Sequence, residues 1–288
     1  DLARARSLGA PASTVEYLNR LAVAGHSLLY GFSRPRTRVH PGQWYYAFAR
    51  GVRSAPGAVL TAFLALFVPA VVSYLAVQLY PILAFDLVGP EFYDFRPTSA
   101  EHLHEIPHLV RPIAASTIIS NNLQVTFMAF ALGITAGIGT TLLLIYNGIH
   151  IGSVAGWMTY QGQARSLWGW IMPHGATELI AICLAGAAGY LLADAILAPG
   201  LRTRVAALQQ AGSRALVIEL GCMAMLLFAG LIEGLVSPSA IPFGARLAIL
   251  AASLLLWGVY FFFAGRGVAP GQAPTEPEEW WVEADSAG

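Results

Sequence analysis

The apolar residues of this chain are gathered into long, nearly continuous runs. A helix needs about 20 predominantly apolar residues to cross the hydrocarbon core of a bilayer. Each run lies inside the chain, which distinguishes it from a signal peptide. The runs predict transmembrane helices over Ala58–Val77, Val125–Tyr146, Ile171–Leu192, Ala215–Val236 and Leu247–Ala264.

A sixth apolar run, Ile149–Tyr160, is shorter and is bracketed by Asn147-Gly148 and Gln161-Gly162. It predicts a short, tilted or half-spanning helix. We expect Asn147-Gly148 to interrupt the helix, because glycine permits unusual dihedrals and an asparagine side chain can bond to freed backbone groups. The fold class predicted is therefore all-α: a polytopic membrane protein of about six transmembrane helices.

The arginines predict the orientation of these helices. The segment before the first span carries many arginines, which by the positive-inside rule places it in the cytoplasm. The loop 79–112 is mainly acidic and is expected outside, whereas Arg202, Arg204 and Arg214 place the next long connection inside. Six crossings with both termini in the cytoplasm fit this pattern, and five crossings with a re-entrant segment are the alternative. The N-terminal arginines are Arg4, Arg6, Arg20, Arg34, Arg36, Arg38, Arg50 and Arg53.

On this basis the chain divides into three parts. Residues 1–57 form a cytoplasmic, partly interfacial arm, in which Ser13–Leu29 predicts an amphipathic helix. At its end Trp44, Tyr45, Tyr46 and Phe48 stand among arginines, which is typical of the membrane interface. Residues 58–264 form the transmembrane domain. Residues 265–288 are rich in glycine, proline and glutamate, which is typical of a disordered tail.

The composition agrees with a membrane protein. Hydrophobic residues make up 56% of the chain, charged residues only 11%, and the mean hydropathy is +0.60. A soluble domain carries about 25% charged residues. The net charge is zero, so no nucleic-acid partner is expected. The apolar composition makes membrane lipids the expected surroundings of the chain. Cys183 and Cys222 both lie in apolar runs and are predicted to be core residues.

Polar residues at membrane depth are the candidates for chemistry. His174 and Glu178 follow Pro173 and are four residues apart, so they share one helix face. Pro173 and Gly175 suit the start of a helix. A structural interpretation is a polar clamp, completed by Asn121, Asn122 or Asn147. A functional interpretation is a proton relay, an ion or metal site, or a catalytic His/Glu pair.

The residues predicted to share one face are too few for a usual catalytic zinc site, which needs three protein ligands. His150 is a possible third ligand. Glu219 and Glu233 could add ligands or pair with Arg214 and Arg246. We therefore predict no catalytic set, no cofactor and no metal, and leave the enzyme question open.

Two further groups are weaker candidates. The loop histidines His102, His104 and His108 could hold a metal outside the membrane, although a solvated polar loop is the favoured interpretation. Small residues at a spacing near four let helices approach closely. They predict packing faces at Gly133, Gly137, Gly186 and Gly189, which could also join protomers in a homo-oligomer.

The core from residue 121 to residue 200 resembles the stage II sporulation protein M family. The matching features are Asn121-Asn122, Gly133, Gly137, Thr140, Asn147-Gly148 with Gly152, and Pro173-His174-Gly175 with Glu178. The N-terminal part resembles long bacterial members of the family through Asp1–Arg6, Tyr17–Arg20, His26 and Leu28–Tyr30. The resemblance extends to about residue 265, and it implies that a further helical segment precedes Asp1 in the natural chain.

The resemblance implies a membrane scaffold in the bacterial cytoplasmic membrane. In spore formers the named member holds two peptidoglycan-degrading partners, and wider relatives often sit near MoxR-type ATPases. Three hypotheses follow: a scaffold for envelope or cytoplasmic partners, a transporter or channel that uses the His174/Glu178 face, and an intramembrane hydrolase. The absence of a recognisable nucleotide motif favours the first.

Overall fold

The computed structural model describes residues 11, 13–17, 41–88, 111–236, 239 and 241–266. The chain divides into two units, Pro41–Arg266 and a second unit of residues 1–40 and 267–288. All regular structure in the described ranges is helical. Of the predicted amphipathic helix, residues 13–17 are helical and the remainder lies outside the described residues. His102, His104, His108 and residues 267–288 of the tail also lie outside them.

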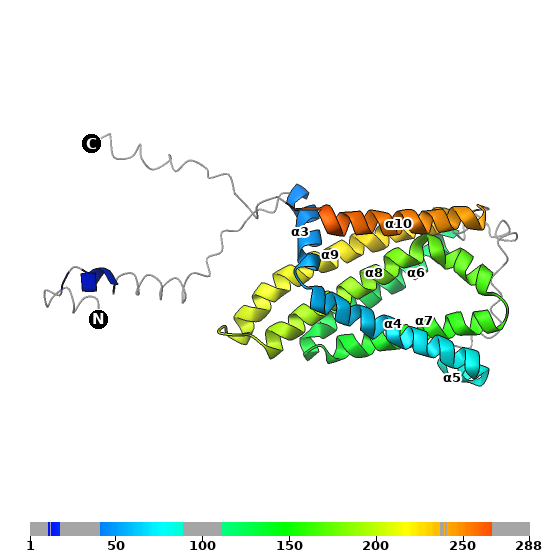
Figure 1. Cartoon of the computed structure of the whole chain (residues 1–288), viewed down its shortest axis with the longest axis horizontal. Coiled ribbons are helices and arrows are strands. Elements are labelled where there is room, and N and C mark those ends of the chain that lie inside the picture. The colour runs from blue at the N-terminus through cyan, green and yellow to red at the C-terminus, as the bar shows by residue number, and fades with distance from the viewer. Residues whose placement is uncertain are drawn as a thin grey trace. The chain divides into compact units, whose positions relative to one another are not determined.

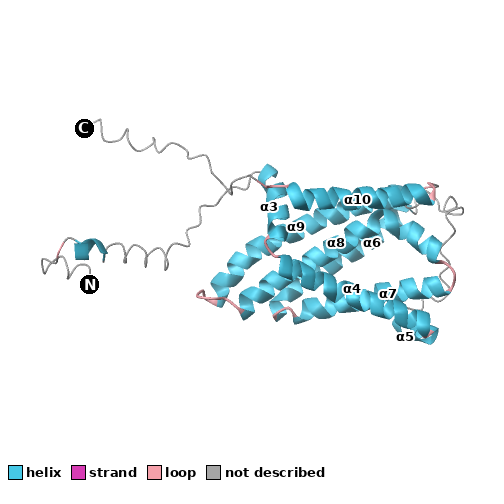
Figure 2. Ribbon diagram, in the orientation of Figure 1, coloured by secondary structure: helices cyan, strands magenta, loops and turns pink. Residues whose placement is uncertain are grey.

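The unit 41–266 is a bundle of helices (Figures 1 and 2). Consecutive long helices run in opposite directions, so α4, α7 and α9 point one way and α6, α8 and α10 the other (Figure 1). The short elements are η1 (Pro81–Leu83), α5 (Ala84–Leu87) and η4 (Leu132–Thr135). The long elements are α3 (Pro41–Arg53), α4 (Pro56–Leu79), α6 (Arg111–Ala131), α7 (Ile138–Tyr160), α8 (Ala164–Leu197), α9 (Arg204–Val236) and α10 (Phe243–Phe263).

Five of these helices are long and apolar enough to cross a membrane: α4, α7, α8, α9 and α10. Their outward faces carry exposed large apolar side chains, such as Leu64, Leu227 and Leu255. Side chains of this kind are stable against lipid rather than water. The all-α, multi-pass membrane fold is thus confirmed. The 21 residues of α6 would also suffice in length, but this helix is more polar, and six crossings stay a prediction.

The predicted interruption at Asn147-Gly148 is wrong. Both residues lie in the middle of the continuous helix α7, and the chain instead breaks between α6 and α7. Ala136 (φ 56°) and Gly137 (φ 82°) both adopt left-handed backbone there. The predicted span 125–146 is therefore split between two helices, and α6 begins inside the segment predicted to be a loop.

The residues at the wrongly predicted break serve helix packing instead. Asn147 Nδ2 donates to the carbonyl of Leu143 within α7, at 2.8 Å. Gly148, Gly152 and Gly156 line one face of α7 and lie against the main chain of α4. Ser73 of α4 donates across this interface to the carbonyl of Ile149, at 3.1 Å. A local sequence signal for a turn was thus a signal for a close helix contact.

The helix α3 packs into the bundle. Phe48 is buried and a Cβ on Gly221 of α9 would overlap its ring. Arg53 donates to the carbonyls of Phe261 and Ala264, at 2.7 Å each, and so binds the C-terminal end of α10. Tyr260 Oη donates to the carbonyl of Tyr45. The end of the arm, predicted to lie at the membrane interface, is therefore part of the compact unit.

Candidate functional site: a buried His/Glu/Glu cluster

The candidate site lies on α8, the most buried of the five candidate membrane-spanning helices. Within an apolar stretch of 18 residues, 67% of the residues of α8 are buried, against 17% in the corresponding stretches of α4 and α10. It packs against α9, α10, α6, α4 and α7. Polar side chains on a central helix are shielded from lipid, which is where ionisable groups of membrane proteins are found.

Pro173 sits inside α8, and Figure 1 shows the helix bending in its N-terminal third. Proline has no N–H, so the carbonyl of Gly169, four residues earlier, loses its helical hydrogen bond. Arg246 Nη1 of α10 donates to this carbonyl at 2.9 Å, and Arg246 Nη2 donates to the carbonyl of Ser239 at 2.6 Å. The guanidinium therefore replaces the missing donor at the bend, immediately before His174.

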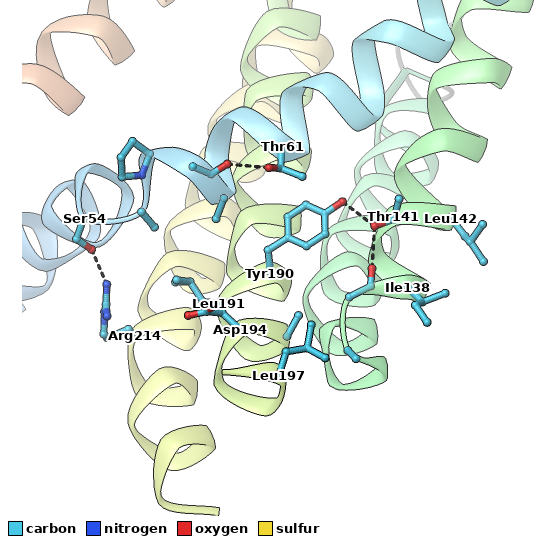
Figure 3. A pocket seen from close by; sticks show the side chains of 17 residues that line it. Ser54, Thr61, Ile138, Thr141, Leu142, Tyr190, Leu191, Asp194, Leu197 and Arg214 are labelled. Atoms are coloured by element: carbon cyan, nitrogen blue, oxygen red, sulfur yellow. Dashed lines mark hydrogen bonds between the residues drawn. The ribbon is translucent and has the colours of Figure 1, made fainter. Parts of the chain in front are cut away.

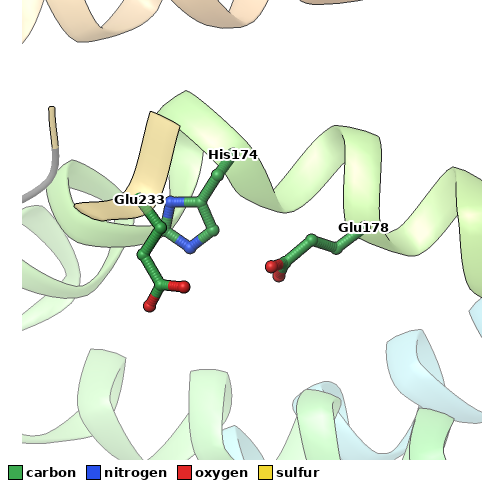
Figure 4. A group of neighbouring side chains, drawn as sticks. All are labelled: His174, Glu178 and Glu233. Atoms are coloured by element: carbon green, nitrogen blue, oxygen red, sulfur yellow. The ribbon is translucent and has the colours of Figure 1, made fainter. Parts of the chain in front are cut away.

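His174 and Glu178 project from α8, and Glu233 reaches them from α9 (Figure 4). One donor atom from each of the three side chains lies within 4.8 Å of the other two. All three residues are buried, with exposed fractions of 3%, 8% and 2%. The spacing of four residues brings the first two onto one helix face, and helix packing alone adds the third.

The carboxyl groups of the cluster have few partners in the described part of the chain. Asn122 of α6 hydrogen-bonds to the Glu178 carboxyl. Glu178 Oε1 and both carboxyl oxygens of Glu233 are buried and lack a hydrogen-bond partner among the described residues. Unpartnered buried carboxyl oxygens are costly, and two neighbouring carboxylates cannot both stay ionised without a compensating charge. The cluster therefore requires a proton or a cation.

The structure brings together some of the residues proposed for the site and separates others. Asn122 joins the cluster, Asn121 is exposed, and Asn147 bonds within its own helix. His150 stacks on Tyr146 in α7 rather than supplying the third group. Trp257 Nε1 donates to Thr177 Oγ1 at 3.1 Å, an interaction that the sequence analysis did not anticipate.

Among the described residues, the carboxyl oxygens of Glu219 and Glu233 accept no hydrogen bond from the arginines that the sequence offered as partners. Arg214 donates to Ser54 Oγ, and Arg246 donates to carbonyls. Glu219, like Glu233, is 2% exposed, and Thr126 of α6 is its hydrogen-bonding neighbour. Glu219 lies about 21 Å from Glu233 along the helix, by a rise of about 1.5 Å per residue, and is not part of the cluster.

An open pocket of about 790 Å³ lies at the other end of α8. Tyr190, Asp194 and Arg214 line it with apolar residues of α7 and α8, and Tyr190 Oη bonds to Thr141 Oγ1 at 2.9 Å (Figure 3). Asp194 is about 30 Å from His174 along the helix. The pocket and the buried cluster are therefore separate features.

Comparison with known families now bears on the cluster. The family described as Stage II sporulation protein M matches residues 59–238. The chain belongs to this family. All three cluster residues lie within the matched segment, whereas Arg246 lies outside it.

One curated relative of the chain is an uncharacterized protein of Methanocaldococcus jannaschii. It is 35% identical over 75 residues, which cover 26% of this chain and 42% of that protein. The chain thus spans less than half the length of the curated relative that it matches. No solved structure matches the chain.

Proposed function

We propose that this chain is an integral membrane scaffold of the stage II sporulation protein M type, which holds partner proteins at the cell envelope. The observation that carries the proposal is how the helices meet. α7 lies against α4, and η4 against α8, at glycines where a Cβ would overlap the opposing main chain. Contacts of this kind tolerate little sliding, because side chains flanking each glycine block neighbouring registers. A helix bundle whose helices cannot slide past one another suits a protein that holds partner proteins in place.

The same contacts argue against alternating access. In many secondary transporters one group of helices rocks against another around the bound substrate. Here the helix that carries His174 and Glu178 is itself joined to η4 through Gly189 and Gly133. Motion of α8 relative to its neighbours would break this contact.

The connection between α8 and α9 is where we expect a cytoplasmic partner to bind. These helices have 34 and 33 residues and are each about 50 Å long, against about 30 Å of hydrocarbon. Their shared end carries the exposed residues Leu201 and Arg202. The positive-inside rule assigns this end to the cytoplasmic side of the inner membrane. A MoxR-type ATPase system is the partner class implied by the family.

Photo-crosslinking tests the scaffold. A photoreactive residue at Leu201 is expected to crosslink to a MoxR-type ATPase from the same genome when both proteins are reconstituted in liposomes. Leu255, an exposed apolar residue on α10, is the matched control and should give no such product. Equal crosslinking at both positions, or none at either, would count against a scaffold that binds this partner through the α8–α9 connection.

A second candidate is cation-coupled transport, and the buried His/Glu/Glu cluster is the observation that favours it. Ionisable groups inside a membrane domain often mark ion pathways. The same liposomes discriminate the two functions. A scaffold should show no proton or Zn²⁺ flux above that of empty liposomes. Flux that disappears in Glu178→Gln and Glu233→Gln would replace the scaffold by a transporter.

A further inference from the structure

We propose that His174, Glu178 and Glu233 form a binding site for one divalent transition-metal ion of the zinc type. This inference goes beyond the scaffold function and does not depend on it. It rests on three observations: three donor groups converge from two packed helices, all three are buried, and carboxyl oxygens of both glutamates lack a hydrogen-bond partner in the described part of the chain.

The distances suit a single ion. Two ligand atoms that each lie about 2.1 Å from one zinc ion are at most about 4.2 Å apart. The three donor atoms here lie within 4.8 Å of one another. The terminal torsions of glutamate are flexible. Small rotations of the Glu178 and Glu233 side chains would therefore bring the three donor atoms close enough together to bind one ion. Helical bundles commonly build metal sites in this way, from inward-facing residues of neighbouring helices.

Charge balance supports a divalent ion in particular. Two ionised glutamates carry two negative charges, and the neutral imidazole of His174 adds none. A divalent cation therefore gives these three side chains and the ion a net charge of zero. A neutral unit avoids the large desolvation penalty of isolated charges in a low-dielectric core. A metal ion would also coordinate one carboxyl oxygen of Glu178 and one of Glu233, whereas a single shared proton leaves more of these oxygens without a partner.

The donor set indicates the class of metal. One imidazole nitrogen and two carboxylate oxygens form a mixed set that suits Zn²⁺ and related first-row ions. Ca²⁺ prefers six to eight oxygen ligands, and Mg²⁺ seldom uses an imidazole. Three protein ligands also leave one coordination position for water or for a partner's side chain.

The neighbouring helices hold the ligands in place. Trp257 of α10 donates to Thr177, which lies on α8 between the two ligands. Asn122 of α6 hydrogen-bonds to the Glu178 carboxyl, as outer-shell groups do for metal-binding carboxylates. Glu233 lies three residues before the end of α9, so the cluster is close to one end of the bundle. An ion could therefore enter from that side.

The test uses the full chain, purified in detergent, stripped with a chelator and then dialysed against a zinc buffer. Metal analysis is expected to find one Zn²⁺ per chain. Glu178→Gln and Glu233→Gln should bind Zn²⁺ at least tenfold more weakly. Glu219→Gln is the matched control, because Glu219 is an equally buried glutamate on α9 that lies outside the cluster. It should bind as the parent protein does.

X-ray absorption of the zinc-loaded parent protein keeps the proposal testable if a variant fails to fold. The expected first shell contains only nitrogen and oxygen, with one imidazole. Sulfur in the shell would point to Cys183 or Cys222 and overturn the assignment. So would absence of bound zinc in the parent, or equal binding in all variants. Protonation of the glutamates would then explain the cluster.

Discussion

A Cβ atom on Gly133 would overlap the carbonyl group of Gly189, so η4 and α8 meet at these two glycines. Both residues belong to small-residue runs predicted to be packing faces, and the structure shows that they face each other. Close approach of this kind gains van der Waals contact between main chains, which is a principal source of helix association in lipid.

Gly133→Ala should therefore destabilise the bundle. The added methyl group has no space unless η4 or α8 shifts, and overpacking of this kind costs about 1–3 kcal/mol. The free energy of unfolding, measured by titrating a mild detergent with SDS, checks the value. Gly258→Ala is the control, because a Cβ on Gly258 of α10 meets no atom within 4 Å. A loss of stability as large in the control would contradict the packing argument.

Replacement of Arg246 by methionine should also destabilise the protein. The carbonyl of Gly169 would lose the donor that compensates for Pro173, and an unsatisfied buried polar group costs about 1–3 kcal/mol. Pro173→Ala restores a backbone N–H four residues after Gly169. The cost of Arg246→Met should thus be smaller in the Pro173→Ala background. Additive effects in this double-mutant cycle would show that the two residues are not coupled.

Arg53→Lys should loosen the attachment of α3. One guanidinium reaches two carbonyls at the end of α10, and an ammonium on a flexible stem cannot reproduce that fork. Hydrogen exchange of the amides of Pro41–Arg53 should accelerate, whereas exchange in α8 should not change. Arg202→Lys, at an exposed position, serves as the control. Unchanged protection of α3 in Arg53→Lys would exclude a role for this contact.

Glu178 variants distinguish packing from ionisation. Glu178→Leu should destabilise the protein, because Asn122 loses its partner and the polar lining of the cluster is broken. Glu178→Gln keeps the shape and the hydrogen bonding, and should unfold within about 1 kcal/mol of the parent protein. The free energy of unfolding of the chelator-treated, metal-free proteins in detergent measures both, because bound metal would add its own stabilisation. Equal losses in the two variants would mean that the negative charge itself stabilises the fold.

Cysteine labelling tests the orientation in the membrane. Ser99→Cys, in the acidic loop, should react with an impermeant maleimide added from outside the cell. Ser286→Cys and Leu201→Cys should react only after the membrane is opened. The native Cys183 and Cys222 are fully buried and should contribute little background. Labelling of residue 286 or 201 from outside would reverse the predicted topology.

The sequence by itself determined the fold class and two of the three cluster residues. Apolar runs of bilayer length are local features, and they specify helices in a membrane whatever the helices pack against. The four-residue spacing of His174 and Glu178 is equally local, since any helix places these side chains on one face. The same rule identified small-residue runs as packing faces before their partners were known.

Only the tertiary structure decided which faces meet. Glu233 joins His174 and Glu178 because α9 packs on α8 at one rotation and register, which the sequence of neither helix states. The helix break was misplaced for the same reason: a glycine that permits a turn also permits close packing, and the neighbouring main chain of α4 selects the second use at Gly148. Arg246 likewise gains its role only when α10 brings a donor to the carbonyl that Pro173 leaves free.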